Sequence, residues 1–359
     1  MKKLFAIVLS GVLLLGLLSG CAGAHVHVCP TQPVSNQSAA TQPAAETQEQ
    51  TLAQGAVKTG LAVIADVADS TSAAADAEGA ASYNVVLAAV TVDENGVIQS
   101  CALDSVGSTV NFDTTGTITT DLTAAPLSKN ELGDDYGMKA YAGSTYEWYE
   151  QAQAVADYAV GKTAQELAEG AVNESGKAAD ADLAAVATIS IGSYVDAIVK
   201  AVNNASDLGA QSGDKLVLTT MNGLGSSTNA QADADGLAQL DVNVVALTLN
   251  GETITSCILD GLQAKVNFDA TGTITTDLTA APQTKNELGE AYGMKAYAGS
   301  TYEWNEQAAS FAAYVTGKTA EEVAGIAVDE SSKVTEADLA TSVTISVGGF
   351  LGLIAKAAA

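Results

Sequence analysis

The sequence contains no arginine, and its only two histidines, His25 and His27, lie close to the N-terminus. A serine or cysteine nucleophile is usually activated by an imidazole base, so catalytic sites of that kind are not expected in the folded part of the chain. A bidentate arginine clamp on a phosphate or carboxylate is excluded as well. Aromatic residues make up 5% and charged residues 16% of the 359 residues, but 47% are hydrophobic, which is sufficient for ordinary cores.

Positive charge is also scarce. Fifteen cationic residues, all lysine, face 42 acidic residues, and the formal net charge is -27. Nucleic-acid binding requires a clustered positive surface, so we expect no nucleic-acid partner. The acidity favours solubility and repels other anionic polymers. The length predicts about two domains of roughly 100–200 residues each.

The first residues are typical of an export signal. Two lysines precede an apolar run over residues 4–18, which is too short to favour a permanent membrane span. The run ends in the letters LSGC, which resemble a bacterial lipobox and imply diacylglycerol on the sulfur of Cys21. We therefore predict a signal peptide over 1–20, membrane attachment through the lipid of Cys21, and a location at the cell surface, outside the cytoplasmic membrane.

Residues 21–56 are rich in Pro, Gln, Thr, Ser and Ala and poor in large apolar side chains. Such a composition buries too little surface to order a chain. We predict a disordered stalk that links the lipid anchor to the folded part, and the sequence leaves the role of Cys29 within it open.

An internal repeat dominates the remaining sequence. Residues 112–152 and 268–308 are identical at 35 of 41 positions, at a constant offset of 156 residues. Weaker matches continue on both sides, so the repeated unit has the size of a normal domain. We predict two tandem homologous modules, module one over 57–206 and module two over 207–359.

Each module has strand patterns first and helix patterns afterwards. Asn95-Gly96 is a hairpin signal between β-branched runs over 83–92 and 97–103, and Asn250-Gly251 is its counterpart. A second hairpin is predicted over 109–120. The predicted fold class is α+β, with an antiparallel β-meander followed by helices in each module.

The helical part begins with a predicted cap at Ser144 or Thr145. Its apolar residues recur with helical spacing and form one predicted buried face in each module; they are Trp148, Ala152, Val155 and Ala159 in module one, and Trp304, Ala308, Phe311 and Val315 in module two. We also predict a short strand or turn over 187–191 and a closing helix over 193–202.

Two features resemble chemical motifs but have simpler interpretations. The letters GKT at 161–163 lack the glycine that a phosphate-binding loop needs five residues before its lysine, so we predict a helix end at Gly161 and a new cap at Thr163. Cys101 and Cys257 occupy equivalent strand positions, one in each module. We interpret them as buried thiols rather than a redox pair, and their role stays open.

The end of each module carries the most informative motif. Residues 182–190 read DLAAVATIS and residues 338–346 read DLATSVTIS. Both resemble the D-x-x-S-G-A-T-x-S motif of the FMN-binding domain family, which includes subunits of membrane redox complexes and extracellular electron-transfer lipoproteins. The family's Ser-Gly pair is replaced by Ala185-Val186 in module one and by Thr341-Ser342 in module two, where a glycine would allow a tight turn.

The resemblance implies that FMN is joined to a threonine through a phosphodiester bond by a flavin transferase. Its cofactor-binding residues would be Thr188, Thr344, Asp182, Asp338, Ser190 and Ser346. This predicts a lipid-anchored electron carrier with external redox partners. The alternative is a non-catalytic surface lipoprotein, adhesin-like or a spacer, that keeps the fold and has lost the flavin.

Overall fold

The computed structural model describes residues 55–358, and the chain divides into two units, residues 1–50 and 51–359. The predicted signal peptide over 1–20, the lipidated Cys21 and nearly all of the predicted stalk over 21–56 lie outside the described residues. Everything below concerns the second unit.

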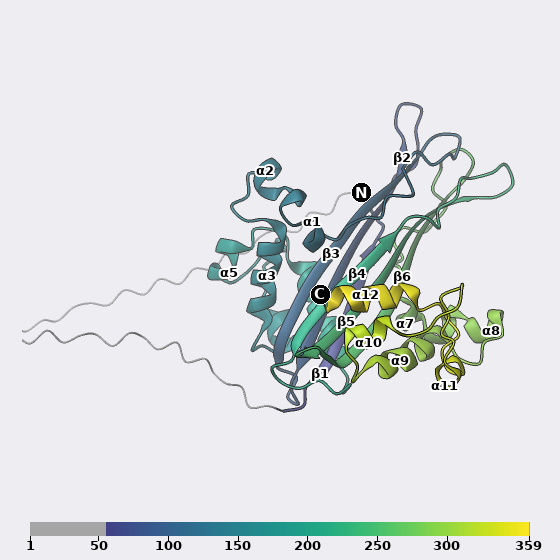
Figure 1. Ribbon diagram of the computed structural model, residues 1–359. Helices are drawn as coiled ribbons and strands as arrows, with labels where there is room; N and C mark the ends of the chain where they lie inside the picture. Colours follow the sequence, from purple (N-terminus) through teal and green to yellow (C-terminus); the bar gives the residue numbers. More distant parts are fainter. Residues whose placement is uncertain (1–54, 359) are drawn as a thin grey trace, which may run out of the picture. The chain divides into compact units, whose positions relative to one another are not determined.

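The first half of this unit is an antiparallel meander followed by helices (Figure 1). Its strands have the order β1-β2-β3, and the helices form a covering over 129–203. The elements are β1 (Lys58–Asp66), β2 (Gly79–Val92), β3 (Ile98–Phe112), α1 (Lys129–Leu132), the 3₁₀ helix η1 (Gly133–Tyr136), α2 (Met138–Ala142), α3 (Trp148–Ala159), α4 (Ala164–Gly170), α5 (Ala181–Val186) and α6 (Gly192–Asn203).

The second half repeats this order, with a sheet of order β4-β5-β6. The elements are β4 (Lys215–Gly223), β5 (Gly236–Asn250), β6 (Thr253–Phe268), α7 (Lys285–Leu288), η2 (Gly289–Tyr292), α8 (Met294–Ala298), α9 (Trp304–Val315), α10 (Ala320–Ala324), α11 (Ala337–Ala340) and α12 (Gly348–Ala357). The predicted α+β class, with two meanders each followed by helices, is thereby confirmed.

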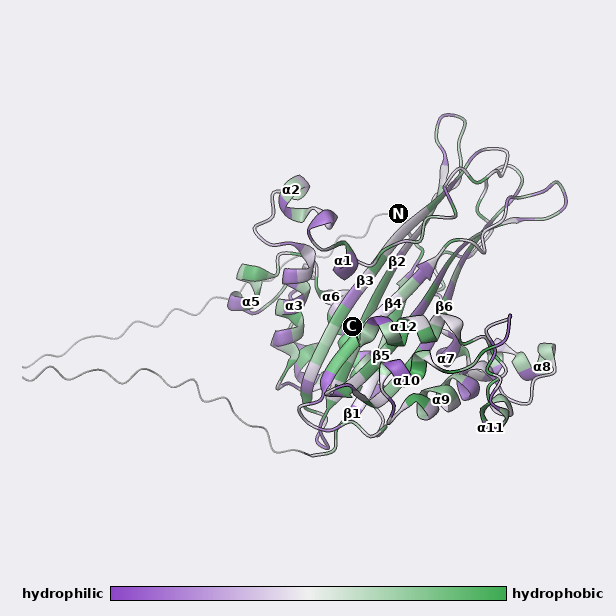
Figure 2. Ribbon diagram, viewed as in Figure 1, coloured by the Kyte–Doolittle hydropathy of each residue, from purple (hydrophilic) through white to green (hydrophobic). Residues whose placement is uncertain are grey.

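The central strands are buried on both faces. Along β2 the side chains alternate between two cores: Val86, Ala88 and Val90 face the helices, whereas Val85 and Leu87 face the second sheet. A strand covered on both faces is a continuous apolar run and not an alternating one. Figure 2 shows hydrophobic stretches along the strands of both sheets.

Three apolar cores therefore define four layers in the order helices, sheet, sheet, helices. The outer cores join α3 and α6 to the first sheet, and α9 and α12 to the second. The middle core takes side chains from all six strands or the segments that continue them, and lies between the sheets. The predicted apolar helix faces are confirmed, because all eight of their residues are buried.

Contacts across the middle core are reciprocal at the repeat offset. The rings of Phe112 and its counterpart Phe268 stack on each other, with centroids 4.0 Å apart and planes 2° apart. Lys200 pairs with Glu287, and its counterpart Lys356 pairs with Glu131. The two halves thus meet through the same surface of each, as in a two-fold symmetric dimer.

Several predicted boundaries are wrong. Helix α3 begins at Trp148 and not near Ser144. Its N-cap residue is Glu147, whose amide donates to the Glu150 side chain, while the Ser144 hydroxyl donates to the Tyr146 carbonyl. Of the strand or turn predicted over 187–191, the structure has a loop with a bend at Ile189 and no strand. The second arm of the predicted hairpin over 109–120 reaches β3 through a single bridge, from Ile118 to Phe112, and forms no strand.

Other local predictions are confirmed. The hairpin turns at Asn95-Gly96 and Asn250-Gly251 join β2 to β3 and β5 to β6. Thr163 caps α4 through its side chain. The closing helix predicted over 193–202 is α6.

Candidate functional site

The loop between α5 and α6 is held by one buried side chain from α3. Gln151 is fully buried, and its Oε1 accepts hydrogen bonds from the Thr188 amide (2.8 Å), the Thr188 hydroxyl (3.1 Å) and the Ile189 amide (3.1 Å). Its Nε2 donates to the Ser144 hydroxyl and the Tyr146 carbonyl. A single side-chain amide therefore fixes the backbone at Thr188. Thr188 itself is exposed.

The same arrangement occurs in the second half. Oε1 of the buried Gln307 accepts from the Thr344 amide (2.7 Å), the Thr344 hydroxyl (3.0 Å) and the Ile345 amide (3.1 Å). Thr344 is also exposed. We call the two arrangements the Thr188 corner and the Thr344 corner.

The other residues of the motif lie apart from the glutamines. Asp182 and Asp338 are exposed residues in the short helices α5 and α11, and no hydrogen bond within residues 55–358 joins either carboxylate to a corner threonine. Ser190 and Ser346 are exposed in the loop before the closing helix. The structure thus brings each threonine to a glutamine and leaves the aspartate and serine outside that contact.

The backbone at the corners does not need the family's glycine. Val186 is the last residue of α5, and Ser342 follows α11. Neither has a positive φ; within the described part of the chain, Ser332 is the one non-glycine residue that does. The expectation that a tight turn at this position calls for glycine is therefore wrong for this chain.

One cation lies beside the Thr188 corner. The ammonium of Lys177 donates to the Thr188 carbonyl at 2.7 Å, and Lys333 holds the equivalent position in the second half, where its backbone bridges to Ser346. Both lysines are exposed. An attached phosphodiester would find a positive charge here, although no arginine clamp is possible.

The corners are better suited to covalent attachment of a group at the threonine than to its enclosure in a pocket. Each threonine is an exposed residue, and its hydroxyl donates to a glutamine oxygen that keeps two amide donors if the hydroxyl proton is lost. Attachment at the oxygen would thus leave the buried glutamine satisfied. Sequence reasoning missed Gln151 and Gln307; their signal was a polar residue inside the identical letters EQA on an otherwise apolar helix face.

The two cysteines of the described chain are free and unsuited to redox exchange. Burial raises the pKa of the Cys257 thiol to about 12, and burial with the nearby Asp157 raises that of Cys101 to about 12. A thiol with such a pKa is scarcely ionised at neutral pH and therefore reacts slowly.

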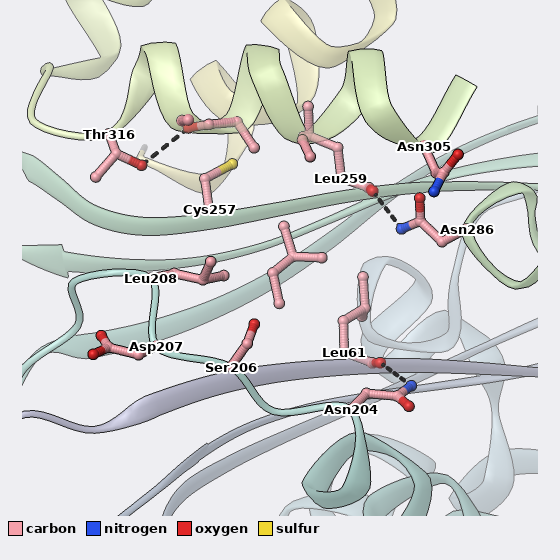
Figure 3. A pocket seen from close by; sticks show the side chains of 14 residues that line it. Leu61, Asn204, Ser206, Asp207, Leu208, Cys257, Leu259, Asn286, Asn305 and Thr316 are labelled. Atoms are coloured by element: carbon pink, nitrogen blue, oxygen red, sulfur yellow. Dashed lines mark hydrogen bonds between the residues drawn. The ribbon is translucent and has the colours of Figure 1, made fainter. Parts of the chain in front are cut away.

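A cavity of about 530 Å³ lies where the two halves meet, away from both corners (Figure 3). We call it the seam cavity. Its walls come from α9, from β6, from the start of α7, from β1 and from the segment that follows α6. It was not predicted, and its signal was a difference between the repeats. Asn305, Ala309 and Ala313 of α9 stand where α3 has the larger Tyr149, Gln153 and Asp157. The lining residues are Leu61, Asn204, Ser206, Asp207, Leu208, Cys257, Ile258, Leu259, Asn286, Asn305, Ala309, Ala312, Ala313 and Thr316.

Comparison with protein-family models, curated proteins and solved structures finds no match for this chain. Between residues 55 and 358 no helix combines the length and the apolar character needed to cross a membrane.

Proposed function

We propose that this chain is a cell-surface lipoprotein that carries FMN covalently at Thr188 and Thr344 and transfers electrons outside the cytoplasmic membrane. The lipobox at Cys21 supports the location, and the motifs over 182–190 and 338–346 support the cofactor. The observation that carries the proposal is the corner built twice, in which a buried glutamine holds an exposed threonine by its backbone and hydroxyl. The modules, 57–206 and 207–359, would then be copies of one flavin-bearing unit.

When bound, FMN would supply the redox chemistry, and the protein would supply its placement. Gln151 and Gln307 would keep the threonine backbone fixed, and Lys177 would lie near the phosphodiester at Thr188. A flavin transferase is the partner that this reaction needs. The polar stalk would let the carriers move through a volume near the membrane and reach redox partners.

Intact-mass measurement of the full chain produced together with a flavin transferase tests the proposal. We expect a mass gain of two FMN units and a yellow protein. Thr188→Ala and Thr344→Ala should each remove one unit, and the double variant should remove both. Ser193→Ala, which alters an exposed hydroxyl of α6 outside the motif, is the matched control and should keep both units.

A chain that gains no mass and stays colourless would contradict flavin attachment. That result would favour the second candidate, a non-catalytic surface lipoprotein of the adhesin or spacer type. The observation in its favour is that neither corner threonine lines the seam cavity, so the flavin ring would have no enclosure there.

A further inference from the structure

We propose that the outer edge of β4 binds an extended segment of another polypeptide, one that carries a large apolar side chain among small ones. The segment would add to the second sheet as a further strand. The site uses none of the corner residues, so the proposal is independent of flavin attachment.

The equivalent edge of the first sheet already holds such a segment. The chain leaves α6 and runs along the outer edge of β1 as residues 204–211, which we call the linker segment. The Thr59 amide donates to the Ser206 carbonyl at 2.9 Å, and the Ser206 amide donates to the Thr59 carbonyl at 3.0 Å. The Asn204 side chain donates to the Leu61 carbonyl at 3.0 Å. The linker segment thus pairs with β1 as an antiparallel strand would.

The edge of β4 lacks a counterpart of this segment. Leu216 and Leu218 of β4 stand at the positions that Thr59 and Leu61 hold in β1. Within residues 55–358, no backbone group outside the second sheet forms a hydrogen bond with Leu216 or Leu218. The edge therefore presents amide and carbonyl groups to which an extended chain can add.

Burial differs between the two edges at the same positions. Residues 59–62 of β1 are all buried, whereas residues 216–219 of β4 are all half-buried. The strand beside each edge shows the same contrast, because residues 256–257 of β6 are buried and residues 100–101 of β3 are half-buried. The surface that the linker segment covers in the first half is thus partly open to solvent in the second.

The side chains of the linker segment indicate the chemistry of the partner. A Cβ at Gly209 would come within 2.7 Å of the Thr255 carbonyl oxygen, so the segment also packs closely against β6 and needs small residues there. Leu208 is its one large apolar residue. At the edge of β4, Leu216 replaces Thr59, so this wall is more apolar and favours a large apolar side chain on the partner.

Charge favours another protein over a second copy of this chain. Two copies would each bring a net charge of -27 and would repel each other. Lys215 is the one charged residue of β4, so the edge itself does not repel a segment that carries little charge or a few acidic groups.

Titration of the full chain with a fluorescently labelled peptide, followed by its anisotropy, tests the proposal. The peptide has the sequence of the linker segment, Asn-Ala-Ser-Asp-Leu-Gly-Ala-Gln, with blocked ends. We expect saturable binding of one peptide per chain, because the edge of β1 is already occupied by the chain's own segment.

Methylation of single peptide nitrogens tests the pairing on the unaltered chain. A methyl group on the amide that corresponds to Ser206 removes the donor to the Leu216 carbonyl and should raise the Kd about two- to tenfold. The amide of Asp207 donates no hydrogen bond to the part of the chain that the structure describes. Its methylation is the matched control and should leave the Kd within about twofold.

Leu216→Lys should raise the Kd of the unmethylated peptide about tenfold or more, because lysine on an edge strand opposes the addition of a further strand. Met221→Lys makes the same substitution at an exposed position of β4 and should leave the Kd within about twofold. The methylated peptides need no variant of the chain, so the test holds even if Leu216→Lys does not fold.

The proposal is overturned if the unaltered chain shows no saturable binding, if the two methylated peptides bind alike, or if a folded Leu216→Lys chain binds as Met221→Lys does. It is also overturned if light scattering finds the unaltered chain dimeric and Leu216→Lys monomeric, since a second copy would then cover the edge. None of these outcomes bears on flavin attachment, which is measured separately by mass.

Discussion

Gln151 is the residue on which the Thr188 corner depends. It lies on the buried face of α3 among apolar residues, yet both ends of its amide are fully used. The three donors at Oε1 come from the loop before α6, and the acceptors at Nε2 come from the loop before α3. One side chain therefore joins two loops whose contacting residues, Ser144 and Tyr146 in one and Thr188 and Ile189 in the other, are 42 to 45 residues apart in the chain.

We predict that Gln151→Leu destabilises the chain by about 3 kcal/mol, because the Thr188 and Ile189 amides and the Tyr146 carbonyl lose their partner in a buried site. Urea denaturation measures the change. Gln153→Leu makes the same substitution at an exposed position of α3 and should cost about 0.5 kcal/mol or less. Equal losses in the two variants would contradict the role assigned to Gln151.

A buried carboxylate from the last strand of each sheet accepts a hydrogen bond from the first helix that follows, α1 or α7. Asp104 and Asp260 lie at equivalent positions, and burial is the main cause that raises the pKa of both. Asp260 accepts from the Gly261 and Asn286 amides, which limits but does not cancel the effect of burial. Its pKa is raised from 3.8 to about 6.

This raised pKa makes stability depend on pH. Between pH 6 and pH 4 the folded chain holds a proton on Asp260 that the unfolded chain has released, so folding becomes more favourable as the pH falls through this window. We predict that the free energy of unfolding rises by about 1 kcal/mol more in the unaltered chain than in Asp260→Asn when the pH falls from 7 to 5. Urea denaturation at both pH values measures it.

Asp196→Asn removes one acidic group from an exposed position of α6 and is the control for a change in net charge. Its pH dependence should follow that of the unaltered chain. If the free energy of unfolding changed equally with pH in Asp260→Asn and in the unaltered chain, this result would contradict the raised pKa of Asp260.

At the scale of the elements, the short helices are fixed by their first turns. Ser128, Thr163, Thr284 and Thr319 each form a capping box with a glutamate three residues later. Helices of four to seven residues have little stability of their own, so the caps and the packing decide where they start.

We predict that Thr163→Ala lowers the free energy of unfolding by about 1 kcal/mol, because the Glu166 amide loses its acceptor. Thr163→Ser keeps the oxygen and should differ from the unaltered chain by a few tenths of a kcal/mol at most, about the spread among good caps. Thermal unfolding of the three proteins provides the comparison. A Ser variant as unstable as the Ala variant would argue against a capping role.

Local signals predicted most elements but not all of their limits. The turn at Asn95-Gly96, the cap at Thr163 and the apolar face of α3 follow from neighbouring residues, and all three are confirmed. The strand β1 was not identified, because a run such as LAVIA lacks the alternation that marks a half-exposed strand. The predicted start of α3 is wrong because its N-cap residue, Glu147, is held by hydrogen bonds from two backbone amides of α2. These bonds form only in the folded chain.

At the scale of the folded unit, the middle core makes the two sheets depend on each other. Phe112 and Phe268 stack across it, and each ring also lies against a glycine of its own sheet. A Cβ at Gly79 would come within 2.3 Å of the Phe112 ring, and one at Gly236 within 2.5 Å of the Phe268 ring. Any residue larger than glycine at position 79 or 236 would therefore collide with the stacked pair.

We predict that Phe112→Ala destabilises the chain by about 3–5 kcal/mol and that both halves still unfold in one transition. Differential scanning calorimetry measures the midpoint and the number of transitions. The control is Tyr141→Ala, which removes a large side chain that is 89% exposed and should leave the midpoint nearly unchanged. Two transitions, of which only one shifts in Phe112→Ala, would contradict a shared core.

The sequence by itself determined the repeat, because its letters recur at a fixed offset. It also determined the α+β order, the hairpin turns and the cap at Thr163, because each of these depends on residues close together in the chain. It also located the two motifs that end in Thr188 and Thr344. Only the tertiary structure decided that the two sheets share a core, that Gln151 and Gln307 hold the threonines, and that a cavity lined by Asn305 lies at the seam. An apolar strand looks the same in sequence whether a helix or a second sheet covers it, so the partner of each face emerges only when the chain is folded.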